Sequence, residues 1–280
     1  MKTPKVFLTP HGGYTPGWST FGPVSRVIKQ FYQKTLGTFL INSVVNGLRS
    51  VSKWETRETV KSGVKPEIVR TITNGLKAEV YTDIAKLASD EIKSQVKKIG
   101  TYIVQVGRIH PIKNQLTTIK SLTLLPDHIS FAIAGPVTDP EYIKTLDDTI
   151  RDLKLEHRVH FLGVVEGTDT FYLLKHSLAN VHMAIWESYC NAVHESMSQG
   201  CICIVSKDTA LEELIKDGVN GYCVPAHDFN EVASKVKYVL DNSTSSDIKK
   251  MRLNNIKFTK GHSWEEISAQ VRKFYSEILT

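Results

Sequence analysis

From Thr101 onward, short apolar runs alternate with segments of helical periodicity. Six runs are rich in β-branched residues, and several are apolar nearly throughout, as strands buried on both faces of a sheet must be. The strands are predicted at 101–108, 129–135, 158–163, 179–185, 201–206 and 221–225, and the helices at 114–125, 141–155, 169–177, 191–200, 210–218 and 228–242. Six strand–helix units of this kind predict an α/β fold with a doubly wound parallel sheet.

The first hundred residues predict a smaller, partial unit. A strand at 5–10 leads into the Gly-rich loop HGGYTPGW, and residues 24–40 have the pattern of an amphipathic helix. Two further strands are expected within 39–48 and 68–75. These predicted elements are too few for an independent doubly wound domain and too many for a linker.

Two helices are expected in the last thirty residues. The final helix begins with Ser263 as its N-cap, and Glu266 follows three residues later, which is the pattern of a capping box.

Composition places the chain among globular proteins. It has 280 residues, of which 41% are hydrophobic and 23% charged, and this fits one large or two ordinary domains and excludes wholesale disorder. No apolar run approaches the ~20 residues of a membrane span, and the N-terminus lacks the pattern of a signal peptide. Four cysteines without framework spacing indicate reduced thiols and a cytoplasmic location. Cys201 and Cys203 are interpreted as strand packing rather than half of a zinc site.

The positive charge is concentrated at the start of the chain. Residues 1–75 carry 11 Lys+Arg against 3 Asp+Glu, whereas the remainder carries 24 against 26. This imbalance predicts an anionic partner for the first quarter alone, and no signature of specific nucleic-acid binding is present. The helix at 24–40, with Lys29 and Lys34 beside its apolar face, fits docking at an anionic membrane surface. The alternative is that the apolar face packs on the partial sheet and the cations are solvated.

Candidate chemistry follows the strand ends, because ligands of parallel sheets bind beyond the carboxyl ends of the strands. Gly107 follows the first strand of the larger sheet, and Arg108 and Lys113 bracket the start of the next helix. A planar guanidinium and an ammonium in this position suit a diphosphate at a helix N-terminus. The alternative is a pair of solvated loop cations.

Acidic residues follow the fourth and fifth strands. Glu187 stands at the end of the fourth strand, and Glu195 lies eight residues later in the first turns of the next helix. Both can point into one crevice, where carboxylates are suited to bind sugar hydroxyls. Glu213, after the fifth strand, can lean toward the same crevice. The alternative for all three is an acid on the protein surface.

These motifs together resemble a known family. The stretches VGRIHPIKN, FLGVV, Glu187-x7-Glu195 and EELIKDGVNGYCVP are similar to the C-terminal half of a retaining GT-B glycosyltransferase, above all to glycosyltransferase family 4. ITNGLK before the interdomain hinge and the ending FTKGHSWEEISAQVRKFY also resemble that family. The likeness implies a truncated N-terminal, acceptor-side domain at 1–77, a Rossmann-like nucleotide-sugar-binding domain at 78–255, and a helix at 256–280 that crosses back.

The resemblance also implies roles for particular residues. Arg108 and Lys113 would hold the donor diphosphate and stabilise it as a leaving group. Glu187 would contact hydroxyls of the transferred sugar, and Glu195 would bind the nucleotide ribose.

Further positions complete the implied site. The backbone of Tyr189, Cys190 and Asn191 would line the sugar and phosphate subsite, close to Gly107. His11 would face the sugar from the N-terminal domain, and Glu213 matches a further acid of the family pattern. The sequence departs from the family where Ser-Tyr-Cys follows Glu187 in place of Gly-aromatic-Gly, and where His194 replaces an aliphatic residue.

The sequence therefore predicts a retaining, metal-independent, hexosyltransferase-like enzyme without a cofactor. The resemblance implies a UDP- or GDP-linked sugar as the donor, and a lipid-linked compound or a glycan as the unidentified acceptor, and it is also the basis for expecting retention. No Asp-x-Asp motif is present to hold a divalent cation. The alternatives are a non-catalytic nucleotide-sugar-binding module and an epimerase or phosphorylase of the same fold, since fold does not fix function. No segment resembles the pyridoxal-binding lysine site of a phosphorylase.

Overall fold

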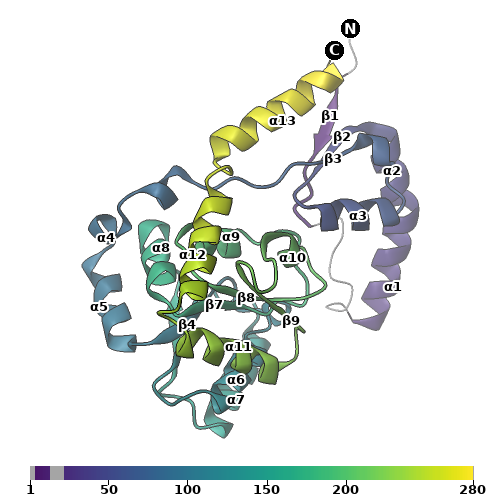
Figure 1. The fold of residues 1–280 in the computed structure, drawn as a ribbon. Coiled ribbons are helices and arrows are strands. Elements are labelled where there is room, and N and C mark those ends of the chain that lie inside the picture. Colours follow the sequence, from purple (N-terminus) through teal and green to yellow (C-terminus); the bar gives the residue numbers. More distant parts are fainter. Residues whose placement is uncertain (1–3, 13–21, 280) are drawn as a thin grey trace.

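A six-stranded parallel sheet forms the centre of the larger part of the molecule. The computed structural model describes residues 4–12 and 22–279 and is shown in Figure 1. The strand order is β6-β5-β4-β7-β8-β9, and every neighbouring pair is parallel. The strands are β4 Tyr102–Val106, β5 Ser130–Ala134, β6 Val159–Gly163, β7 Ala179–His182, β8 Cys203–Ser206 and β9 Gly221–Val224. The predicted doubly wound sheet is confirmed, and its order reverses between β4 and β7.

Helices cover both faces of this sheet, and together they form the larger unit. Alternate strand residues enter different cores: Ile103 and Phe131 pack on one face, and Val104 and Ala132 on the other. This alternation is what the pleat of a strand requires. The helices are α4 Ile84–Leu87, α5 Asp90–Ile99, α6 Gln115–Ser121, α7 Pro140–Asp152, α8 Gly167–His176, α9 Asn191–Ser198, α10 Leu211–Leu214, α11 Phe229–Asp241 and α12 Ser246–Thr259.

Three short strands form the smaller unit, in the order β1-β2-β3 and again parallel. The strands are β1 Val6–Leu8, β2 Val45–Ser50 and β3 Val69–Thr71, and the helices are α1 Pro23–Tyr32, a π-helical segment Gln33–Gly37, α2 Thr38–Val44 and α3 Lys53–Lys61. Short 3-10 turns lie at Pro66–Ile68, Ala78–Tyr81, Pro111–Lys113 and Leu122–Leu124.

The strand expected within 39–48 is present, but it occupies only the last part of that range. Residues 39–44 belong to α2, and the strand begins at Val45. Phe39, Leu40 and Val44 continue the three- and four-residue spacing of the preceding helix, so this part of the apolar run follows the helical period.

The last helix, α13 (Trp264–Leu279), returns from the larger unit to the small sheet (Figure 1). Ile267 and Phe274 of α13 pack with Ile72 and Phe7 of the smaller unit. The capping box at its start is confirmed, because Glu266 N–H donates to Ser263 Oγ at 3.2 Å and Ser263 N–H donates to the Glu266 carboxylate at 3.1 Å.

Two chain segments cross where the units join. Leu76 N–H donates to the His262 carbonyl at 2.7 Å, and Trp264 N–H donates to the Leu76 carbonyl at 3.1 Å. Gly75 lies directly against this crossing, because a Cβ there would lie 2.6 Å from Trp264 Cα. The boundaries proposed at 77/78 and 255/256 stay predictions.

All four cysteines are free and buried. In the part of the chain that the structure describes, none of the helices combines the length and the hydropathy needed to cross a bilayer.

We expect Gly75→Ala to lower the free energy of unfolding by roughly 1–3 kcal/mol, because the new methyl group meets backbone that cannot move without opening the crossing. Urea denaturation measures the loss. Gly22→Ala is the matched control, since a Cβ at Gly22 meets no atom within 4 Å. Equal stability of the two variants would contradict the tight crossing.

Candidate functional site

A cavity of about 240 Å³ opens at the carboxyl ends of β4 and β7, where the strand order reverses. This switch point is where open α/β sheets bind ligands. The cavity is lined by His11, Val51 and Asn74 of the smaller unit and its linker, and by Val106, Gly107, Lys113, His182, Glu187, Ser188, Tyr189, Cys190, Asn191 and Ala192. Seven predicted site residues therefore meet here, whereas Arg108, Glu195 and Glu213 do not line the cavity.

A buried ion pair lies at the base of this cavity. The Lys113 ammonium donates to the Glu187 carboxylate, and Nε2 of His182 lies 3.6 Å from a Glu187 oxygen. Burial alone would raise the pKa of Glu187, but His182 and Lys113 outweigh it and hold this pKa at about 2. Burial would lower the pKa of Lys113, but Glu187 outweighs it and raises this pKa. Both groups are consequently charged at neutral pH.

His182 and Cys190 complete the surroundings of Glu187. Burial lowers the pKa of His182, which favours the neutral imidazole, and its Nε2 faces the Glu187 carboxylate. Burial, with Glu187 next, raises the pKa of Cys190 to about 12, which leaves a thiol rather than a nucleophilic thiolate.

His182, Glu187 and Cys190 could be considered as metal ligands, because their donor atoms lie within 4.8 Å of one another. The Lys113 ammonium, however, already binds the Glu187 carboxylate. A positive charge in this position disfavours a second cation.

The start of α9 forms one wall of the cavity. Cys190 has a left-handed φ of 71° and makes no side-chain cap, so the first N–H groups of α9 have no capping side chain. Such a helix end favours an anion. The neighbouring Tyr189 hydroxyl contacts Nδ1 of His194 at 3.0 Å and lies 3.2 Å from the Asn74 carbonyl, and these contacts fix the loop.

Arg108 and Glu195 lie near the cavity without lining it. Arg108 is exposed directly after Gly107, and its guanidinium has no ion pair with a described residue. Glu195 lies one turn into α9, where burial raises the pKa of its carboxyl group and Lys77 opposes the rise. Its carboxylate accepts no hydrogen bond from residues 4–12 or 22–279.

Glu213 contacts the smaller unit instead of the cavity. Its carboxylate accepts the backbone N–H groups of Lys53, at 2.9 Å, and of Trp54, at the start of α3. A carboxylate at a helix N-terminus is favourable. The rings of Trp54 and Trp186 meet edge to face at 5.8 Å beside it, so this contact connects the two units.

The smaller unit positions His11 through a buried carboxylate. Glu55 accepts the backbone N–H groups of Gly12 and of Val51, the latter at 2.7 Å, and thereby joins the ends of β1 and β2. His11 has a left-handed φ of 46°, and burial, then Arg49, lowers its pKa. Residues 13–18 of the Gly-rich loop lie outside the described residues.

Three residues around the cavity were not singled out by the sequence: Asn74, Glu55 and His182. Asn74 donates to Asn191 Oδ1 at 3.1 Å and accepts from Arg49 at 3.0 Å. In the sequence, the Asn-Gly pair of ITNGLK could have pointed to Asn74. The presence of an imidazole within an apolar strand could have pointed to His182. Glu55 gave no local signal for its contact with Gly12, because the two residues are 43 positions apart in the sequence.

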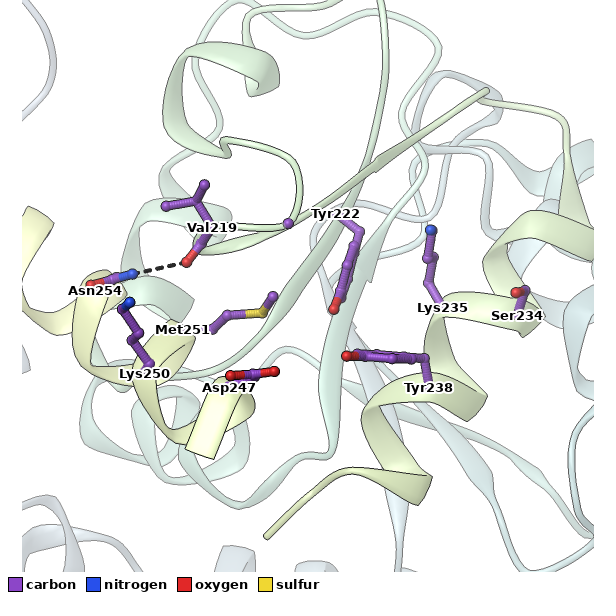
Figure 2. A pocket seen from close by; sticks show the side chains of 10 residues that line it. Val219, Tyr222, Ser234, Lys235, Tyr238, Asp247, Lys250, Met251 and Asn254 are labelled. Carbon is purple, nitrogen blue, oxygen red and sulfur yellow. Dashed lines mark hydrogen bonds between the residues drawn. The ribbon is translucent and has the colours of Figure 1, made fainter. Parts of the chain in front are cut away.

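A larger cavity, of about 470 Å³, lies elsewhere, between α11 and α12 beside β9 (Figure 2). The Lys235 ammonium lies 5.2 Å from the centre of the Tyr222 ring, and Asn254 donates to the Val219 carbonyl at 2.9 Å. None of the predicted site residues lines it.

Comparison with protein families gives one match. The family described as Glycosyl transferases group 1 matches residues 88–259, which is more than half of the chain.

Two curated relatives are similar over shorter stretches. A GDP-mannose-dependent alpha-mannosyltransferase of Corynebacterium glutamicum is 26% identical over 100 residues, covering 35% of this chain and 24% of the relative. The UDP-Gal:alpha-D-GlcNAc-diphosphoundecaprenol alpha-1,3-galactosyltransferase of Escherichia coli is 27% identical over 168 residues, covering 58% and 42%. The chain thus matches less than half the length of either relative.

Solved structures share the fold. HepE of Anabaena in complex with UDP and glucose superimposes with a TM-score of 0.85 at 20% identity, covering 97% of this chain and 71% of HepE. Sucrose-phosphate synthase of Thermosynechococcus elongatus gives a TM-score of 0.79 at 16% identity, covering 98% and 67%. The predicted GT-B-like fold is confirmed by these neighbours.

The buried His194 predicts a dependence of stability on pH. Burial, then the neighbouring His262, lowers the pKa of His194 to about 3, against 6.5 for an ordinary histidine. Between these values the unfolded chain binds a proton that the folded chain does not. His194 should therefore contribute a fall of about 1.4 kcal/mol per pH unit to the unfolding free energy as the pH drops from 6 to 4.

His194→Phe removes the titrating group, and we expect its pH slope, from urea denaturation at each pH, to be shallower by that amount. His157→Phe is the control, because His157 is exposed. Parallel slopes for wild type and His194→Phe would show that His194 does not set this dependence.

Proposed function

Because the chain belongs to the group 1 glycosyltransferases, we propose that it transfers a sugar from a nucleotide-diphosphate-sugar donor, with retention of configuration and without a metal ion. The observation that carries the proposal is the cavity at the β4–β7 switch point, lined by Lys113 and by the uncapped start of α9. A HepE structure holds UDP-glucose, and one curated relative is GDP-mannose-dependent, and both support a UDP- or GDP-linked sugar as the proposed donor.

The donor diphosphate would be held by positive charge. An ammonium has three donors, and Glu187 uses one donor of Lys113, which leaves others for phosphate oxygens. Arg108 at the rim and the N–H groups of α9 add further donors. Preorganised donors of this kind stabilise the charge that grows on a leaving diphosphate.

The sugar and ribose would contact the remaining walls. Glu187 and the backbone of residues 189–191 would hold the transferred sugar, with His11 on the opposite side. Glu195 would bind the ribose hydroxyls, and a carboxylate that accepts no hydrogen bond from the described residues supports that role. Glu213 would act at the rim, where its contact with α3 keeps the two units together.

The groups around the cavity fit a mechanism in which the acceptor attacks the same face of the sugar from which the phosphate leaves. Glu187 is a poor nucleophile, because its carboxylate is tied to Lys113 and His182 and its pKa is held at about 2. The bond between the anomeric carbon and the phosphate oxygen would break as the bond to the acceptor oxygen forms on the same face. The acceptor proton would pass to the departing phosphate oxygen.

The acceptor we propose is lipid-linked or a glycan. The name of the Escherichia coli relative gives it a diphosphoundecaprenol-linked acceptor. With such an acceptor, the protein would work in the cytoplasm at the membrane periphery.

Incubation with UDP-glucose, UDP-galactose and GDP-mannose, followed by mass spectrometry, tests the function. Release of nucleoside diphosphate with transfer or slow hydrolysis supports a transferase. Binding without turnover would identify a non-catalytic module, and formation of an epimeric sugar nucleotide would identify an epimerase.

We expect Glu195→Ala to weaken nucleoside diphosphate binding by at least about tenfold, because a hydrogen bond to a charged group contributes roughly 1.5–3 kcal/mol. Calorimetric titration measures the dissociation constant. Glu141→Ala, at the exposed start of α7, is the control. Equal affinities of wild type and Glu195→Ala would remove Glu195 from the ribose subsite.

Arg108→Ala should lower kcat about tenfold or more and affect donor binding less, since charge on the diphosphate grows as the sugar leaves. Arg108 gives a cleaner test than Lys113, whose loss would strip the buried Glu187 of its ion-pair partner. Arg151→Ala, on the exposed part of α7, serves as the control. Turnover within about twofold of wild type would exclude the diphosphate role.

A further inference from the structure

The pocket between α11 and α12, beside β9, lies entirely within the larger unit (Figure 2). Its volume of about 470 Å³ falls in the roughly 300–1,000 Å³ range of small-molecule sites. All of its lining residues fall between positions 218 and 254, inside the stretch 88–259 that the group 1 family matches. None of them is a residue proposed to bind the donor, so the proposed function leaves this pocket unexplained.

Three elements contribute side chains to the pocket. Tyr222 of β9 packs in the same core cluster as Met251 of α12. Tyr238 stands on the flank of α11, and its ring meets that of Tyr222 edge to face with the ring centres 6.0 Å apart. Asp247, Met251 and Asn254 recur at four- and three-residue steps, so they lie along one side of α12. Polar and apolar side chains of a strand and two helices therefore meet around one hollow.

The Tyr222 hydroxyl is the group that points most directly to a ligand. The Tyr222 side chain is only 6% exposed, and its hydroxyl makes no hydrogen bond with any residue that the structure describes. The hydroxyl oxygen is open to the pocket, and Figure 2 shows it directed, like that of Tyr238, toward Asp247. Burial, then Tyr238 and nearby acids, raises the pKa of Tyr222 to about 12. The phenol consequently keeps its proton at neutral pH and can both donate and accept.

The remaining polar groups of the pocket include both donors and acceptors. Asp247 offers carboxylate oxygens. Asn254 donates through Nδ2 to a backbone carbonyl at 2.9 Å, which leaves its Oδ1 as an acceptor. Lys235, whose ammonium lies 5.2 Å from the centre of the Tyr222 ring, and Lys250 offer donors. The lining can thus bind a molecule that has donors and acceptors of its own.

The edge of β9 beside the pocket is already occupied. The Cys223 N–H donates to the Asp217 carboxylate at 2.9 Å, and the Gly221 carbonyl accepts the Gly218 N–H at 2.9 Å. A strand from another chain would need these backbone groups free. The pocket is therefore not suited to adding a strand to the sheet.

The two signs of charge on the lining disfavour a simple ion. A cation would meet the ammonium groups of Lys235 and Lys250, and an anion would meet the Asp247 carboxylate. An uncharged molecule rich in hydroxyl groups suits both signs, because a hydroxyl donates to a carboxylate and accepts from an ammonium. Its C–H groups would pack on Met251 and on the tyrosine rings. Saccharides combine these two features on one ring.

We infer that this pocket is a second saccharide-binding site, which holds an uncharged hexose residue apart from the donor cavity. The hydroxyl groups of Tyr222 and Tyr238 and the Asp247 carboxylate would bind the sugar hydroxyls, and Met251 would contact the apolar face of the ring. A role in retaining a glycan acceptor on the enzyme rests on the proposed function, whereas saccharide binding itself does not.

Saturation-transfer difference spectroscopy of the whole chain tests the inference. The probes are methyl α-D-glucopyranoside, methyl α-D-galactopyranoside and methyl α-D-mannopyranoside, which carry no phosphate or nucleotide. We expect saturation transfer to at least one of them, and titration of that glycoside gives its dissociation constant.

Tyr222→Phe with Asp247→Asn should raise this dissociation constant at least about tenfold, because each change removes a hydrogen-bonding group from the pocket. Tyr222→Phe keeps the ring that packs in the core. Tyr172→Phe with Asp90→Asn is the matched control, since Tyr172 is half-buried on α8 and Asp90, like Asp247, lies in the first turn of a helix. The control should bind the glycoside as the wild type does.

A second variant tests the contribution of the aromatic surface. Tyr238→Ala should raise the same dissociation constant severalfold, because the sugar loses a ring on which its C–H groups pack. Tyr32→Ala, at a similarly exposed position on α1, is the control. Thermal unfolding and titration with UDP show that each variant is folded and that its donor cavity is intact.

Several results would overturn the inference. These are the absence of saturation transfer to all three glycosides, or equal dissociation constants in test and control variants, which would place the sugar in the donor cavity. Binding of inorganic phosphate or Ca²⁺ that Tyr222→Phe with Asp247→Asn abolishes would assign the pocket to an ion. Glycoside binding that the pocket variants lose, in a protein that turns over no sugar nucleotide, would uphold this site and reject the proposed function.

Discussion

The ion pair between Lys113 and Glu187 is the interaction on which the candidate site depends. Each charge is removed from water, so each requires the other, and the loss of either partner would leave an uncompensated buried charge. Lys113 follows β4 and Glu187 follows β7, the two strands between which the sheet order reverses. The pair therefore joins the two halves of the sheet at the point where their loops diverge, and the cavity opens above it.

A second set of contacts connects the larger unit to the smaller unit around this cavity. Asn74 bonds to Asn191, and Glu213 receives two backbone N–H groups at the start of α3. The crossing at Leu76 and Trp264 connects the units on the side of α13. Because these contacts involve backbone groups and short side chains, a small shift between the units would break several of them together. The lining of the cavity by residues of both units thus depends on one arrangement of the units.

The sequence allowed the larger sheet and the centre of the site to be predicted, for local reasons. Buried parallel strands are apolar throughout, and the rule of strand ends places Lys113 and Glu187 together without any contact being known. Glu55 and the partner of Glu213 could not be found in this way, since Glu213 and Lys53 are 160 residues apart. The helix predicted at 24–40 continues to Val44, and this continuation was missed because the apolar run at 39–48 also fits a strand and leads into β2.

The two units differ in which groups they bury: the larger unit buries charged groups at the candidate site, and the smaller unit leaves large apolar groups of α1 and α2 exposed. The larger unit buries charge where a diphosphate would need it, and its neighbouring hydrogen bonds compensate the loss of water. The smaller unit turns polar Gln33 and Thr38 inward and leaves Phe31 and Phe39 in solvent. Exposed apolar surface is unfavourable in water, so burial of this face in an apolar environment would be favourable.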